Sequence, residues 1–219
     1  MKTKAVIFDM DGVLFDTQKI YIETWECAAN EMGIENIHDA AYDCIGRNRN
    51  NIEQYLKKKF GFEFNVDEFY SRKDVWFDRI IAQRGIPLKV GAREILEFLK
   101  DSEMKTALAT STGQKRAYSH LYQTGLFDMF DIKVTGNMVA NSKPAPDIYT
   151  LACKLLKENP KCCYAVEDSY NGIRSAADAG VRTIMVPDML EPNEETDKLC
   201  CGVYSSLFEF KKQLENELK

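Results

Sequence analysis

Residues 6–14 read Val6-Ile7-Phe8-Asp9-Met10-Asp11-Gly12-Val13-Leu14, and this stretch decides how the rest of the chain is interpreted. The apolar run over residues 5–8 is short, as is typical of a strand that is buried on both faces. Asp9 and Asp11 follow at the end of this strand, and Gly12 provides the turn by which the chain leaves the sheet. Because open α/β sheets bind ligands beyond the carboxyl ends of their strands, we expect both carboxylates to border a ligand site.

Two carboxylates this close resist being ionised together, so either a cation lies between them or one of them carries a proton. A Mg²⁺ ion, which prefers oxygen ligands, would accept Asp9 and bring a phosphate to it. Asp9 could then attack phosphorus and form an aspartyl-phosphate, while Asp11 served as general acid and base. The alternative is a simple Asp-x-Asp-Gly turn, in which both side chains accept hydrogen bonds from nearby backbone N–H groups.

The composition is that of an ordinary globular protein. The chain has 219 residues, of which 45% are hydrophobic and 29% charged, enough for one sizeable domain or a core with a smaller one. The net charge of −5 gives no reason to expect nucleic acid or an anionic membrane as a partner. No apolar stretch approaches the roughly 20 residues that span a bilayer, and the first apolar run is too short for a signal peptide.

Cysteine and histidine usage indicates the compartment. There are seven cysteines and two histidines, with no Cys-x-x-Cys motif and no histidine at zinc-ligand spacing from a cysteine. We therefore expect reduced thiols in a cytoplasmic protein. Two histidines also offer few candidates for a histidine-based metal centre or a histidine-dependent triad.

The order of the predicted elements indicates an α/β fold. Helical periodicity without a strand signal runs from residue 17 to about 84, with helices over residues 16–32, 48–60 and 66–81. Strands and helices then alternate, with strands over residues 105–110, 132–135, 162–166, 181–186 and 201–204 and helices over 92–99, 115–124, 146–157, 172–179 and the last segment to 219. This alternation predicts a doubly wound parallel sheet, with an all-α segment inserted after the first strand.

Three later strand ends carry polar groups that suit the two opening carboxylates. Thr110 and Ser111 close one strand, where hydroxyl and N–H groups can hold an anion, or can simply cap the next helix. Lys143 precedes two prolines that restrict the backbone, which favours an inward ammonium over a solvated one. Glu167 and Asp168 close a further strand as candidate cation ligands, although Asp168 could instead be a helix cap.

These motifs, in this order, resemble those of the haloacid dehalogenase-like phosphotransferase superfamily, and the resemblance covers almost the whole chain. It is closest to the branch of β-phosphoglucomutases and sugar-phosphate phosphatases. The matching motifs are Phe8-Asp9-Met10-Asp11-Gly12-Val13-Leu14, Lys143-Pro144-Ala145-Pro146-Asp147 and Val166-Glu167-Asp168-Ser169. The resemblance implies these roles: Asp9 as nucleophile and Mg²⁺ ligand, Asp11 as acid/base with its carbonyl on the metal, Thr110 and the Ser111 N–H as phosphate cradle, Lys143 as charge-balancing lysine, and Asp168 with Glu167 as metal ligands.

The resemblance also implies two domains. A Rossmann-like catalytic core would comprise residues 1–16 and 88–219, and a helical cap would comprise residues 17–87. Such a cap closes over the active site, excludes water and selects the substrate.

Within the cap, three positions bear on the substrate. Arg49 falls where related caps hold a sugar phosphate, because a guanidinium can bind a phosphate with two hydrogen bonds. Lys73 is a second candidate, and the alternative for both residues is a solvated surface position. Related β-phosphoglucomutases carry a histidine at the position of Tyr21, where it helps to couple cap closure to Asp11. A phenol with a pKa near 10 cannot replace that imidazole near neutral pH.

The sequence therefore predicts a monomeric Mg²⁺-dependent phosphatase of a small phosphorylated metabolite, expected to be a sugar phosphate. The first alternative is a hexose-phosphate mutase of the β-phosphoglucomutase type. The second is a non-catalytic sensor of phosphorylated metabolites, which the complete set of Asp9, Asp11, Lys143 and Asp168 disfavours because a sensor needs no nucleophile.

Overall fold

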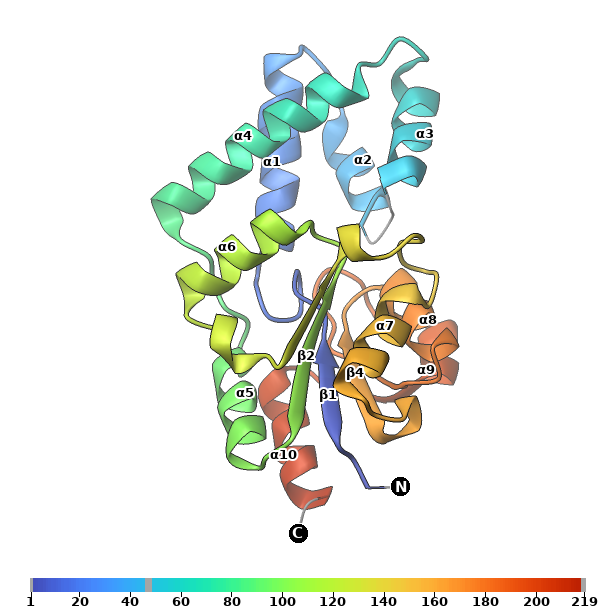
Figure 1. Cartoon of the computed structure of the whole chain (residues 1–219). Helices are drawn as coiled ribbons and strands as arrows, with labels where there is room; N and C mark the ends of the chain where they lie inside the picture. Colours follow the sequence, from blue (N-terminus) through green and yellow to red (C-terminus); the bar gives the residue numbers. More distant parts are fainter. Residues whose placement is uncertain (1, 46–48, 218–219) are drawn as a thin grey trace. The chain divides into compact units, whose positions relative to one another are not determined.

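The computed structural model describes residues 2–45 and 49–217 (Figure 1). The chain forms two compact units, which we call the core unit (Met1–Asp16 with Pro87–Lys219) and the helical unit (Thr17–Ile86). The second boundary between the units precedes Pro87, whereas the sequence analysis placed that residue in the helical segment.

The core unit is built on one parallel sheet. In the described residues the sheet has six strands in the order β3-β2-β1-β4-β5-β6, and every described pair is parallel. Their bounds are β1 (Ala5–Phe8), β2 (Lys105–Thr110), β3 (Ile132–Thr135), β4 (Cys163–Glu167), β5 (Arg182–Met185) and β6 (Cys200–Val203). The predicted α/β fold with a doubly wound parallel sheet is confirmed.

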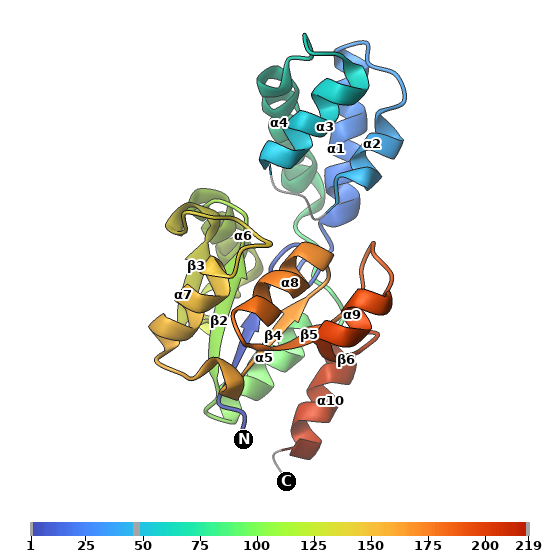
Figure 2. The same cartoon turned by 90° about the vertical axis from the view of Figure 1, so that its right-hand side faces the viewer.

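Helices cover both faces of this sheet, as Figures 1 and 2 show. They are α5 (Ala92–Asp101), α6 (Gln114–Thr124), α7 (Asp147–Leu156), α8 (Tyr170–Asp178), α9 (Glu194–Leu199) and α10 (Leu207–Glu217), with short 3-10 helices η1 (Phe127–Met129), η2 (Gly136–Met138) and η3 (Pro160–Cys162). Because strand side chains alternate, Ala5 and Ile7 pack under α7, whereas the opposite face meets α5 and α10, where the rings of Tyr164 and Phe210 lie 5.5 Å apart. All four residues of β1 are fully buried, so the strand that precedes Asp9 is held from both sides.

The helical unit contains α1 (Gln18–Glu31), α2 (Ile37–Asp43), α3 (Arg49–Phe60) and α4 (Val66–Arg84) within its described part. The two longest helices, α1 and α4, pack on each other through aromatic contacts such as Trp25 with Phe69, whose ring centroids are 5.2 Å apart. No helix in residues 2–45 and 49–217 is long and apolar enough to cross a bilayer.

Some predicted bounds differ from the structure. Helix α4 ends at Arg84 rather than at residue 81. The next residue, Gly85, has a φ of +74° and ends the helix. Helix α8 begins at Tyr170 rather than residue 172, because the Ser169 hydroxyl accepts a hydrogen bond from the Gly172 N–H and caps the helix earlier. Helices α2 and α9 were not predicted individually, since each is only one to two turns long.

We predict that Gly91→Ala destabilises the core unit. Gly91 has a φ of +85°, and a Cβ there would lie 2.2 Å from the Phe208 nitrogen at the start of α10. Backbone cannot give way as a flexible side chain can, so the free energy of unfolding should fall by about 3 kcal/mol, measured by urea denaturation. The matched control is Gly113→Ala, whose φ is −66° and whose Cβ would meet no described atom within 4 Å, with an expected loss below about 1 kcal/mol. Equal losses in the two variants would contradict the prediction.

Candidate active site

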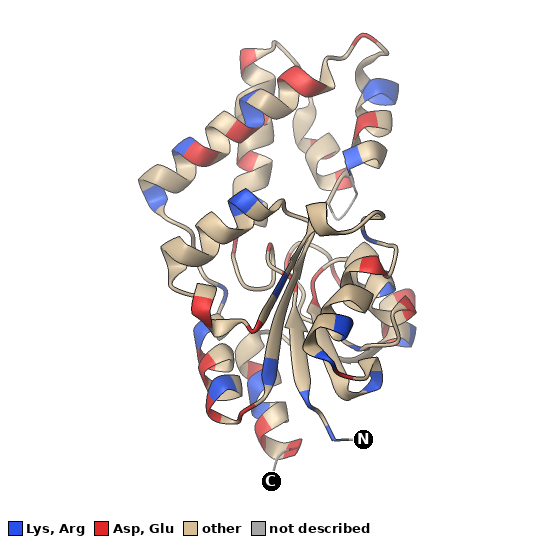
Figure 3. Ribbon diagram, viewed as in Figure 1, with Lys and Arg blue, Asp and Glu red and all other residues tan. Residues whose placement is uncertain are grey.

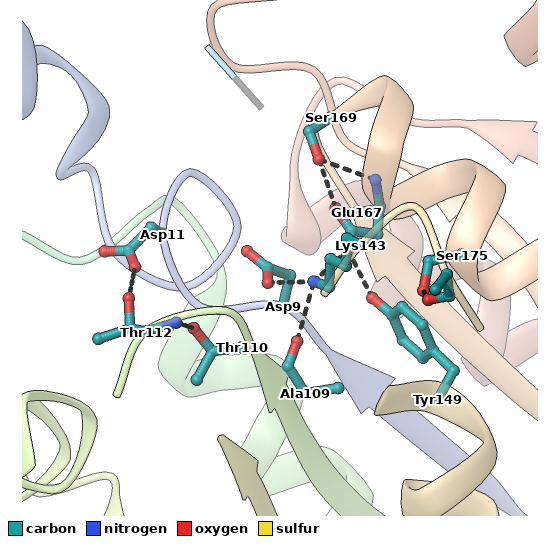
Figure 4. A network of polar contacts seen from close by, with 12 residues as sticks. Asp9, Asp11, Ala109, Thr110, Thr112, Lys143, Tyr149, Glu167, Ser169 and Ser175 are labelled. Carbon is teal, nitrogen blue, oxygen red and sulfur yellow. Dashed lines mark hydrogen bonds and ion pairs between the residues drawn. The ribbon is translucent and has the colours of Figure 1, made fainter. Parts of the chain in front are cut away.

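The carboxyl ends of β1, β2 and β4 bring the polar groups of the site together (Figure 4). Strand β1 lies between the other two, and Phe8 is in register with Leu108 on one side and Val166 on the other. The residues that follow these positions therefore meet at one edge of the sheet, although they come from distant parts of the sequence.

Asp9 is buried, and its carboxylate lies against a lysine. Its Oδ1 atom is 2.5 Å from Nζ of Lys143, and its backbone N–H donates to the Val166 carbonyl at 3.0 Å. Burial raises the pKa of Asp9 to about 7, with the Glu167 and Asp11 charges acting in the same direction and the Lys143 ammonium opposing them. The Lys143 ammonium therefore opposes the loss of the Asp9 charge that burial favours.

Lys143 is the centre of the network. It is 7% exposed, and its ammonium donates to Asp9, to the Ala109 carbonyl at 3.0 Å and to Oε1 of Glu167 at 2.6 Å. Burial alone would lower the pKa of Lys143, but the two carboxylates raise it above its ordinary value, so the lysine stays charged. The alternative of a solvated lysine is wrong.

Glu167 is held by donors on both of its oxygens. Besides Lys143, Oε1 accepts from the Tyr149 hydroxyl at 2.6 Å, and Oε2 accepts from the Ser169 hydroxyl at 3.2 Å. A Cβ on Gly172 would lie 2.0 Å from this carboxylate, so the first turn of α8 can lie against it only with glycine at that position.

Three buried acids could hold a metal ion. Asp9, Glu167 and Asp168 each offer one carboxylate oxygen, and these oxygens all lie within 4.8 Å of one another. Burial, followed by the charges of Asp9 and Glu167, raises the pKa of Asp168 well above its ordinary value. Because Lys143 supplies one positive charge to three carboxylates, a divalent cation with oxygen ligands fits the group.

Asp11 lies in the turn after β1. The turn is closed by a hydrogen bond from the Gly12 N–H to the Phe15 carbonyl at 2.8 Å, and Gly12 has a φ of +87°. The Asp11 carboxylate accepts a hydrogen bond from the Thr112 hydroxyl at 2.8 Å. Since the carboxylates of Asp9 and Asp11 bond groups far away in the sequence, the pair does more than stabilise a local turn.

The end of β2 and the segment after it contribute hydroxyl groups. Thr110 is buried, and its Oγ1 accepts from the Thr112 N–H at 3.1 Å, whereas Ser111 is exposed. Helix α6 has Gly113 at its N-cap, so the Thr110 hydroxyl does not cap the helix directly. Gly136 packs closely on this segment, because a Cβ there would lie 2.2 Å from the Ser111 carbonyl oxygen.

The structure adds three residues that the sequence analysis did not assign to the site, namely Thr112, Tyr149 and Ser169. Ser169 stands where a helix N-cap is expected, so the capping rule could have found it, and it replaces Asp168 in that role. Tyr149 lies on the buried side of α7, and its sequence position alone does not distinguish it from a core tyrosine.

The two predicted cap residues lie in the helical unit and share one aromatic neighbour. The Arg49 guanidinium lies 4.1 Å from the ring centroid of Tyr70, and Nζ of Lys73 lies 4.9 Å from the same centroid. Lys73 is 7% exposed, which excludes a solvated position for it, whereas the side chain of Arg49 is 51% exposed and pairs with Asp67 at 2.7 Å. Residues 46–48, which directly precede Arg49, lie outside the described residues.

Comparisons with known proteins identify the family. The family model described as haloacid dehalogenase-like hydrolase matches residues 6–186. A phosphorylated carbohydrates phosphatase of Thermotoga maritima is 34% identical over 181 residues, which cover 83% of each chain. The CbbY protein of Cereibacter sphaeroides is 28% identical over 207 residues, covering 88% of this chain and 87% of its own.

A solved structure shows the same fold over its whole length. The crystal structure of a β-phosphoglucomutase from Clostridium difficile matches with a TM-score of 0.78 and 25% identity, covering 99% of this chain and 98% of that one. The predicted resemblance and the predicted enzyme class are confirmed by these matches. The chain belongs to the family of haloacid dehalogenase-like hydrolases.

Proposed function

We propose that this hydrolase is a Mg²⁺-dependent phosphatase of small phosphorylated carbohydrates, and that it works through an aspartyl-phosphate. The observation that carries the proposal is the buried Asp9–Lys143 pair beside Glu167 and Asp168. A buried nucleophilic carboxylate, a fixed cation and a group of acids that suits a metal are what transfer of a phosphoryl group to a carboxylate requires.

The proposed reaction has two steps. In the first, an Asp9 oxygen attacks phosphorus and the bond to the leaving oxygen breaks, while Asp11 gives its proton to that oxygen. In the second, Asp11 takes a proton from a water molecule, whose oxygen attacks the phosphorus and releases Asp9 and inorganic phosphate. Thr110 and the Ser111 N–H would hold the phosphoryl oxygens, and Lys143 would balance their charge.

The acids of the site would hold the metal ion. Asp9, Asp168, Glu167 and the Asp11 carbonyl are the proposed oxygen ligands for Mg²⁺. When bound, Mg²⁺ would neutralise negative charge on both the protein and the phosphoryl group.

The proposed substrate is a small phosphorylated carbohydrate. This proposal follows the name of the Thermotoga maritima relative and the cations Arg49 and Lys73, which we assign to substrate binding. Lys and Arg are interspersed with Asp and Glu over the described ribbon of both units (Figure 3), which suits a small anionic substrate better than a polyanion. The direct test is phosphate release from a panel of phosphorylated metabolites, in which sugar phosphates should be the fastest substrates.

A hexose-phosphate mutase is the second candidate, because the Clostridium difficile structure is named as a β-phosphoglucomutase. Tyr21 disfavours it. Its ring stacks on Phe77 with centroids 4.6 Å apart, and Nζ of Lys73 lies 5.3 Å from its ring centroid. A phenol packed in this way does not supply the imidazole that the resemblance implies for a mutase.

The first prediction here concerns the nucleophile. Asp9→Asn keeps the size of the side chain and removes its charge, so no aspartyl-phosphate can form. Phosphatase turnover should fall by at least about 10³-fold, as when other covalent nucleophiles are removed. The exposed residue Asp101 provides the control, since Asp101→Asn should leave turnover unchanged. Retention of even a tenth of the activity by a folded Asp9→Asn variant would overturn the assignment.

A second prediction concerns the metal. Activity should be lost in excess chelator and return on addition of Mg²⁺, because the ligand group consists of hard oxygens. Asp168→Ala should raise the Mg²⁺ concentration for half-maximal activity by about tenfold or more. Asp178→Ala, an exposed position at the end of α8, should leave that concentration unchanged. Full activity of the wild-type enzyme in chelator would exclude the metal.

A third prediction separates the two candidate reactions. With β-glucose 1-phosphate and a bisphosphate primer, the enzyme should release phosphate faster than it forms glucose 6-phosphate, because the Tyr21 phenol cannot replace the imidazole that couples cap closure to Asp11 in related mutases. Both products should be followed in one reaction. Tyr21→His is the matched variant and should raise the ratio of glucose 6-phosphate to phosphate. If the wild-type chain forms glucose 6-phosphate many times faster than phosphate, it is a mutase.

A further inference from the structure

A further acid lies at the same edge of the sheet, in the segment that follows β5. The Val186 N–H donates to the Glu167 carbonyl at 2.8 Å, so residues 186–188 leave the sheet beside the residues that follow β4. Asp188 belongs to this segment, and its side chain is 4% exposed. No motif singled it out in the sequence, because it stands alone after an ordinary apolar strand.

The two oxygens of Asp188 have different surroundings. Oδ1 pairs with Nζ of Lys89 at 2.7 Å, and that lysine side chain is 19% exposed. Oδ2 is buried and accepts no hydrogen bond from any group in the described part of the chain. A buried carboxylate oxygen without a donor is costly, so an ion pair with Lys89 explains only half of this side chain.

The charge of Asp188 also acts on the metal group. After burial, Asp9 and Glu167, it is the next cause of the raised pKa of the Asp168 carboxyl. Asp9, Glu167, Asp168 and Asp188 have two ammonium partners, Lys143 and Lys89, so these six groups carry a net negative charge when all four acids are ionised. A divalent cation would offset that charge.

We propose that Asp188 is an outer member of the cation site, and that its Oδ2 atom accepts a hydrogen bond from a water molecule on the cation. Asp188 is not among the acids whose oxygens all lie within 4.8 Å of one another, so it does not share the ion directly with all three. Mg²⁺ keeps several water ligands in proteins, and these waters are strong donors. The inference rests on the proposed cation at Asp9 and Asp168.

A purely structural role is the competing explanation. The Lys89 N–H donates to the Leu14 carbonyl at 2.9 Å, in the turn after β1, and the Lys89 ammonium pairs with Asp188 in the loop after β5. Lys89 therefore links these two segments. In that case the pair would stabilise the core unit, and breaking it from either side would have the same effect.

Direct binding of Mn²⁺ to the full-length chain distinguishes the two roles. Free Mn²⁺ can be measured by electron paramagnetic resonance, with Mg²⁺ as competitor and no substrate present. Asp188→Asn should raise the Kd for Mn²⁺ by about tenfold, the scale found for outer ligands of metal sites. Lys89→Met breaks the same ion pair but removes a positive charge, so its Kd should stay unchanged or fall.

Each single variant leaves the other member of the Lys89–Asp188 pair without its partner, which could impair folding. The double variant, Lys89→Met with Asp188→Asn, removes both charges and so controls for this effect. It should bind Mn²⁺ about tenfold more weakly than Lys89→Met alone. Equal weakening by the two single variants, or wild-type affinity in Asp188→Asn, would overturn the inference while leaving the cation site intact. If the wild-type chain does not bind Mn²⁺, or if Mg²⁺ does not displace the bound Mn²⁺, the proposed cation site is overturned as well.

Discussion

The buried ammonium of Lys143 is the interaction on which the candidate site depends. It lies between Asp9 and Glu167 and reaches the Ala109 carbonyl, so one side chain joins the ends of β1, β2 and β4. Without it, the two buried carboxylates would lie close together with no positive partner, and at least one would take up a proton. A neutral Asp9 would be a poor nucleophile. The lysine therefore favours the charged form of the proposed nucleophile, and it also fixes the position of Glu167.

Other features of the core unit hold this buried charged group in place. Strand β1 is fully buried in the middle of the sheet, which fixes the direction in which Asp9 leaves it. The Tyr149 and Ser169 hydroxyls donate hydrogen bonds to Glu167, and Gly172 lets α8 approach that carboxylate. A buried polar network is favourable only when its members have partners, so these neighbours are as necessary as the lysine itself.

The groups that we assign to chemistry and those that we assign to substrate binding lie in different units. The described acids that could hold a metal lie in the core unit, together with Lys143, whereas Arg49 and Lys73 lie in the helical unit around Tyr70. In the proposed function, the groups at the sheet edge carry out the chemistry and the inserted helices select the substrate. In the same proposal, Tyr21 favours water over a sugar as the acceptor of the phosphoryl group, while the acids of the core unit stay the same.

The sequence by itself determined the parallel sheet, the inserted helical segment and the family, because strand and helix periodicities and the order of the motifs are local properties. It also marked Asp9, Lys143 and Asp168 as candidates, since each follows a strand or precedes restrictive prolines. Only the tertiary structure brought in Thr112, Tyr149 and Asp188 and replaced Asp168 by Ser169 as the cap of α8. The physical reason is that a hydrogen-bond partner is chosen by distance and burial, and 101 positions separate Thr112 from the Asp11 carboxylate that it contacts.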